Sequence, residues 1–111
     1  MNKQRLLELA DILDRADAEH EARGEPGYDQ ERYTHNCGTP ACALGHWMAA
    51  NPEFMRRNKP GFIIEKAKLE FDLDYGGADD LFGPVGCNGA KTAKQAADYI
   101  RDFVARGGVE L

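Results

Sequence analysis

Apolar residues recur at helical spacing in two long segments, one near each end of the chain. In the first segment the intervals are three and four residues, over Leu6, Leu9, Leu13 and Ala16. This period places side chains on one face of an α-helix. Asn2 is a good N-cap residue, and Gly24 is the residue type that most often ends a helix. The pattern predicts a helix over residues 3–23.

The C-terminal segment shows the same period, over Ala93, Ala96, Ala97, Ile100, Phe103 and Val104. Thr92 and Gln95 form a capping box at its start, because each side chain can accept a hydrogen bond from an unpaired N–H of the first turn. Arg106 suits the negative end of the helix dipole, and Gly107-Gly108 ends the helix.

The middle of the chain predicts shorter elements. Thr39 is a good N-cap and Pro40 suits a first helical position, so we expect a helix from residue 39 to Asn51, just before Pro52. Pro52 starts a short helical turn. Residues 63–72 keep helical spacing, with a small sheet at residues 62–64 as the alternative, and residues 78–82 form a helical turn.

These elements predict one mainly α domain over residues 1–111, with about four helices and possible pairing of two short strands as the alternative. Two loops, at residues 24–38 and 83–91, interrupt the pattern. Loops of this length are unusual in a compact domain and often serve a function. They are therefore the first places to look for a site or for a missed strand pair.

The charge of the chain bears on its partners. Among 111 residues, 42% are apolar and 30% are charged, which is ordinary for a globular domain, and the formal net charge is −5. Binding nucleic acid through its phosphates requires a basic face, and so does docking on anionic lipid. We therefore expect no nucleic-acid partner bound through phosphates and no membrane partner, and we expect a protein partner. The acidic charge leaves room for a basic partner or for mimicry of a nucleic-acid backbone, although −5 is modest for mimicry.

The N-terminal sequence bears on localisation. Residues 1–5 lead into an amphipathic segment and not into the apolar core of a signal peptide, and no apolar run approaches the length of a membrane span. We therefore expect a cytoplasmic protein. Its three cysteines should be mostly reduced there, and an odd count also fits a fully paired disulfide framework poorly.

Two cysteines and two histidines lie close together in the segment His35–His46. Cys42 and His46 are four residues apart, so they share a face on a helix, and His35 and Cys37 precede them in the loop. Two Cys and two His form a ligand set for Zn²⁺, which makes these four residues candidate zinc ligands. The spacing is atypical, because zinc modules usually bring two ligand pairs from separate elements.

A reactive thiol is a second interpretation of this segment. Cys42 would lie in the first turn of its helix, where the dipole lowers a thiol pKa, and His46 could act as its base. Cys37 could then be a resolving partner. No third orienting group and no oxyanion hole are marked in the sequence.

The residues favour a third, structural interpretation. A free cysteine behaves as a small buried hydrophobe, and Cys42 lies among Ala41, Leu44 and Met48. A disulfide between Cys37 and Cys42 is a variant of this interpretation. Gly45 would let another helix approach closely, at a cost of about 1 kcal/mol in helix propensity relative to alanine.

The segment Cys37-Gly38-Thr39-x-x-Cys42-x-x-Gly45-His46 resembles a loose family of small bacterial and phage proteins of unknown activity. The likeness extends over residues 33–104 through a Leu81-Phe82 pair and a later helix, with Thr92, Ala96-Ala97 and Ile100. The resemblance implies a bacterial or phage setting. It assigns no activity, so it implies no functional residue.

Two classes of function follow. The favoured one is a non-enzymatic, protein-binding accessory module without a cofactor, because the surface is acidic and the sequence holds no complete catalytic set. The alternative is a zinc- or thiol-dependent protein that uses His35, Cys37, Cys42 and His46. Metal content and the reactivity of the thiols distinguish the two.

Overall fold

The chain folds as a mainly helical domain, as the hydrophobic pattern predicts. A computed structural model describes residues 1–35, 38–58 and 62–108. Its helices are α1 (Lys3–Arg23), α2 (Ala43–Ala50), α3 (Phe54–Arg57), α4 (Ile63–Phe71), α5 (Tyr75–Phe82), α6 (Gly86–Gly89) and α7 (Ala93–Ala105). α6 is a distorted turn, because Cys87 and Asn88 inside it have positive φ angles. The described residues thus hold six regular helices, more than the four predicted.

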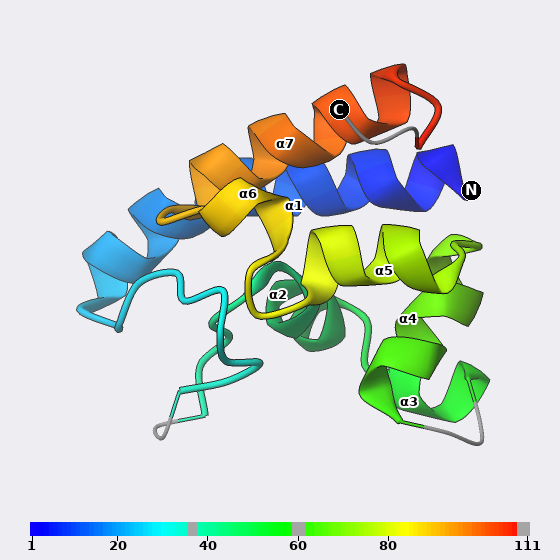
Figure 1. Cartoon of the computed structure of the whole chain (residues 1–111). Coiled ribbons are helices and arrows are strands. Elements are labelled where there is room, and N and C mark those ends of the chain that lie inside the picture. The colour runs from blue at the N-terminus through cyan, green and yellow to red at the C-terminus, as the bar shows by residue number, and fades with distance from the viewer. Residues whose placement is uncertain (36–37, 59–61, 109–111) are drawn as a thin grey trace.

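The two long helices pack side by side in opposite directions (Figure 1). The predicted bounds of α1 are confirmed with its caps: the Asn2 side chain accepts the Arg5 N–H, and Gly24 is left-handed with φ 66°. At the start of α7 the Thr92 hydroxyl accepts the N–H of Gln95. The Gln95 side chain accepts the N–H of residue 91 and not that of Thr92, so the capping box is only partly formed.

The predicted start of the second helix is wrong. α2 begins at Ala43, with Cys42 as its N-cap, and ends at Ala50, with Asn51 as its C-cap at the predicted end. The N–H groups of Ala41 and Cys42 donate to the carbonyls of Tyr33 and Arg32, at 3.0 and 2.9 Å. The chain before Cys42 therefore pairs with the preceding loop, and the N-cap signal of the Thr-Pro pair is overridden by these tertiary hydrogen bonds.

The alternative of a short strand pair is also wrong. Residues 63 and 64 lie in α4 and Phe62 is its N-cap, as the helical interpretation predicts. Across the described ranges the chain has no strand, only one isolated antiparallel bridge between Thr34 and Pro40. The helical turn predicted at 78–82 is the second half of α5, which begins at Tyr75 because the Asp74 side chain caps it.

Apolar faces of the helices meet in one core. α2 and α5 lie against the pair formed by α1 and α7, while α3 and α4 extend the domain beyond them (Figure 1). The largest fully buried apolar side chains of the core are Trp47, Phe54, Phe71, Phe103, Leu6, Leu9, Leu13, Leu44, Leu81 and Ile100. No helix in the described part of the chain is both long and apolar enough to cross a membrane.

One buried carboxylate joins four helices. Glu70 of α4 is 1% exposed. Its carboxylate accepts hydrogen bonds from Trp47 Nε1 at 2.8 Å, Arg5 Nη1 at 3.1 Å, Arg57 Nε at 3.1 Å and Asn58 Nδ2 at 3.1 Å. A buried charge is tolerated when its lone pairs are satisfied in this way. Glu70 therefore fixes α4 against α1, α2 and α3.

Candidate functional site

The predicted Cys and His residues occupy different environments. Cys42 and His46 are buried at the start of α2, with 1% and 5% exposure. His35 precedes them in the loop, and its Nε2 lies 2.6 Å from the carbonyl oxygen of Gly27. Cys37 lies outside the described residues. The structure thus brings together Cys42 and His46 and places the His35 ring against backbone.

The thiol of Cys42 differs from the reactive thiol that the sequence suggested. It accepts the N–H of Gly45 at 3.4 Å, as an N-cap group does. Burial raises the pKa of Cys42, and this effect outweighs the stabilising backbone hydrogen bonds from Gly45 and Leu44. Burial also raises the pKa of Cys87, to about 12. Both thiols therefore stay protonated at neutral pH, which is unfavourable for a nucleophile.

His46 contacts a residue that the sequence analysis did not select. Its Nε2 lies 2.8 Å from Nε2 of His20, which is in the last turn of α1. Its Nδ1 lies 2.7 Å from the carbonyl oxygen of Cys42, and the ring of Tyr28 stacks on it. Burial lowers the pKa of His46, so its neutral form is favoured. His20 follows Ala16 by four residues and so continues the buried face of α1. This spacing is the signal by which the sequence could have indicated His20.

The four-residue zinc set stays a prediction. Among the described residues, which exclude Cys37, no group of three or more His, Cys, Asp or Glu side chains is placed to hold a metal ion. His35 and His46 each have a ring nitrogen against a backbone carbonyl. A metal held by the predicted set would compete with these hydrogen bonds.

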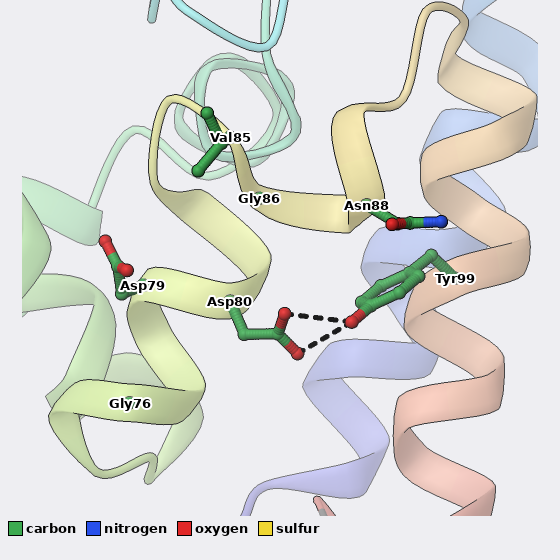
Figure 2. A pocket seen from close by; sticks show the side chains of 7 residues that line it. All are labelled: Gly76, Asp79, Asp80, Val85, Gly86, Asn88 and Tyr99. Carbon is green, nitrogen blue, oxygen red and sulfur yellow. Dashed lines mark hydrogen bonds between the residues drawn. The ribbon is translucent and has the colours of Figure 1, made fainter. Parts of the chain in front are cut away.

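A second candidate site lies between α5 and α7 and was not predicted. It is a pocket of about 410 Å³, here called the acidic pocket, lined by Gly76, Asp79, Asp80, Val85, Gly86, Asn88 and Tyr99. Figure 2 shows Asp80 and Tyr99 pointing toward each other from opposite walls, with Asn88 beside the Tyr99 ring. This volume is in the range of pockets that accept a small ligand or a side chain.

The walls of the acidic pocket are held by hydrogen bonds. The Tyr99 hydroxyl donates to both carboxylate oxygens of Asp80, at 2.8 and 2.9 Å. Burial and the bond to Asp80 raise the pKa of Tyr99, so the phenol keeps its proton. The Asp80 carboxylate is thereby held in position. Each of its oxygens retains lone pairs for a further donor.

The lining of the acidic pocket is negatively charged. Its described residues include Asp79 and Asp80 and no Lys or Arg. Several other aspartates form salt bridges, for example Asp98 with Lys94 at 2.8 Å. Val85, 80% exposed, adds an apolar surface at the pocket's edge. The Arg106 guanidinium lies 5.5 Å from the centroid of the Tyr99 ring, next to this lining. The pocket therefore combines two carboxylates with an apolar contact.

The sequence held only an indirect signal for this site. Residues 85–88 belong to the loop of 83–91 that the sequence analysis marked by its length, although part of that loop is the distorted turn α6. The adjacent pair Asp79-Asp80 gave no signal of its own. Tyr99 is 19 positions from Asp80, and only the packing of α7 against α5 and α6 brings the two together.

A comparison of the chain with protein-family models, curated proteins and solved structures found no match.

Proposed function

We propose that the protein is a non-enzymatic binding module that takes a basic segment of a partner protein into the acidic pocket. The observation that supports this most directly is the pair of carboxylates, Asp79 and Asp80, in a pocket of about 410 Å³ whose described lining includes no Lys or Arg. An arginine or lysine side chain of the partner would supply the missing positive charge.

The geometry of the pocket favours a guanidinium or ammonium group. Tyr99 donates its single proton to Asp80 and accepts a hydrogen bond from the Arg106 side chain. The acceptors that the pocket offers to a further donor are therefore the two carboxylates. Arginine and lysine are donors without an acceptor, which matches a wall of acceptors. Val85 at the edge offers an apolar contact for the methylene stem of such a side chain.

The net charge of −5 supports the same partner class. A negative protein attracts a positive segment over distances longer than direct contact, and this raises the association rate at low salt. The notion of an accessory module in a bacterial or phage setting rests on the sequence resemblance alone.

The test uses a fluorescein-labelled hexa-arginine peptide as probe, with a hexa-glutamate peptide as its negative control. Binding is measured by fluorescence anisotropy for the unmodified chain and for the double variant Asp79→Asn/Asp80→Asn. Asparagine keeps an acceptor for the Tyr99 hydroxyl while it removes both charges. We expect the double variant to bind the probe at least about tenfold more weakly, which corresponds to roughly 1.4 kcal/mol.

The matched control is Glu8→Gln/Glu21→Gln, which removes two charges from exposed positions of α1. We expect this control to keep most of the affinity. If the probe does not bind, or if both double variants lose affinity equally, the acidic pocket is not the binding site and the proposal is wrong.

A further inference from the structure

Two buried imidazole rings face each other between the end of α1 and the start of α2. His20 and His46 are 4% and 5% exposed. Their Nε2 atoms are 2.8 Å apart, and the two rings are nearly perpendicular, at 82°. The two residues come from elements 26 positions apart in the sequence, so only the packed fold forms this pair.

The hydrogen bonds on the other side of each ring fix where the protons lie. Nδ1 of His20 is 3.1 Å from Oε1 of Glu25, and Nδ1 of His46 is 2.7 Å from the carbonyl oxygen of Cys42. A carbonyl and an ionised carboxylate only accept, so each Nδ1 carries a proton. Nη1 of Arg23 also donates to this Glu25 oxygen, at 3.4 Å.

With both Nδ1 atoms protonated, neutral imidazoles direct two Nε2 lone pairs at the same point. Lone pairs 2.8 Å apart repel each other unless a cation lies between them, either a shared proton or a metal ion. A histidine that ligates a metal typically donates its other N–H to a carboxylate or a backbone carbonyl. Here the carboxylate of Glu25 is that partner for His20, and the carbonyl of Cys42 is that partner for His46.

The surroundings leave room for a metal ion with further ligands. A cavity of about 200 Å³ borders the pair, and its wall includes Glu19, Arg23 and Pro40 together with both histidines. A tetrahedral Zn²⁺ with bonds of about 2.0–2.1 Å would hold the Nε2 atoms roughly 3.4 Å apart. The rings need to separate by about half an ångström to reach this distance, and water in the cavity can fill the remaining positions.

We propose that His20 and His46 form a two-histidine site for a divalent transition-metal ion such as Zn²⁺, open to this cavity. The ion takes the place of the shared proton, which leaves to solvent, and imidazole nitrogen is a ligand that suits zinc and copper and not calcium or magnesium. This site shares His46 with the four-residue set predicted from the sequence, but it uses His20 in place of His35, Cys37 and Cys42.

The test is calorimetric titration of the metal-free full-length chain with Zn²⁺ alone, and with Mg²⁺ as the negative control. We expect one Zn²⁺ per chain and no saturable Mg²⁺ binding. His20→Gln should weaken Zn²⁺ binding by more than about tenfold, because even the loss of an outer-shell partner typically costs 10–100-fold. The matched control is His35→Gln/Cys37→Ser, which should bind Zn²⁺ like the unmodified chain.

Circular dichroism establishes that each variant is folded before titration. Should His20→Gln fail to fold, Glu25→Gln replaces it, because it leaves both imidazoles in place and should still weaken binding about tenfold or more. No Zn²⁺ binding by the unmodified chain overturns the proposal. Unchanged binding in His20→Gln, or in its replacement Glu25→Gln, also overturns it, and so does loss of binding in the His35/Cys37 variant, which would favour the four-residue set.

Discussion

Gly45 shows how the absence of a single side chain allows two segments to meet. A Cβ atom at this position of α2 would lie 1.8 Å from the carbonyl oxygen of Tyr33 and 2.9 Å from its carbonyl carbon. That oxygen accepts the N–H of Ala41, so the loop backbone is held in place and has little room to move. The close approach that the sequence suggested at Gly45 therefore exists, but the neighbour is a loop and not a helix.

We expect Gly45→Ala to destabilise the fold, although alanine has the higher helix propensity by about 1 kcal/mol. Overpacking of a fixed neighbour typically costs about 1–3 kcal/mol, and here the neighbour is backbone. The free energy of unfolding from urea titration measures this change. The control is Gly27→Ala, where a Cβ would meet nothing within 4 Å; it should change stability by less than about 0.5 kcal/mol. A neutral or stabilising Gly45→Ala would show that the loop does not approach α2 this closely.

The start of α7 depends on a residue of another helix. The carboxylate of Asp17, in α1, accepts the N–H of Ala93 through Oδ1 and that of Lys94 through Oδ2, each at 3.1 Å. Thr92 accepts the next N–H, so three donors of the first turn are satisfied. Asp17 also places a negative charge at the positive end of the helix dipole.

We therefore expect Asp17→Ala to lower the free energy of unfolding by about 1–2 kcal/mol, the usual cost of losing an N-cap side chain. Glu8→Ala is the control, since Glu8 is an exposed acid of the same helix whose carboxylate accepts a hydrogen bond from the Gln4 side chain, at 3.4 Å. Equal effects of the two substitutions in urea titrations would contradict a capping role for Asp17.

Elements whose signals are local were predictable from the sequence, and contacts between distant segments were not. α1, α4 and α7 show helical periodicity, and for α1 and α7 the signals of the caps lie within a few residues of each end. The start of α2 was misplaced because the hydrogen bonds of Ala41 and Cys42 go to a loop about ten residues earlier. His20 was missed because its partner His46 lies in another helix, and the acidic pocket was missed for the same reason.

The stability of the whole molecule should fall in acid because of Glu70, whose carboxylate joins α4 to Arg5, Trp47 and Arg57. Burial by itself raises the pKa of Glu70, but the hydrogen bonds from Arg57, Trp47 and Asn58 outweigh it, so the pKa lies below its ordinary value. The unfolded chain therefore takes up the proton first as the pH falls.

The direction of the pH effect follows from that order. The stabilisation by Glu70 is present above the unfolded pKa of about 4.3, and it is lost as the pH falls below that value and through the lower pKa of the folded state. Glu70→Gln should cost on the order of 2–3 kcal/mol at pH 7, because it removes the charge that Arg5 and Arg57 contact.

The decisive measurement is the difference in unfolding free energy between the unmodified chain and Glu70→Gln, from urea titrations at pH 7, 5, 4 and 3. This difference should be constant from pH 7 to 5 and shrink below about pH 4.3, since protonation makes the two side chains alike in charge. Glu8→Gln, at an exposed position, should show no such trend. A difference that persists unchanged at pH 3 would mean that Glu70 acts through its shape and neutral hydrogen bonds, and that its charge does not hold the four helices together.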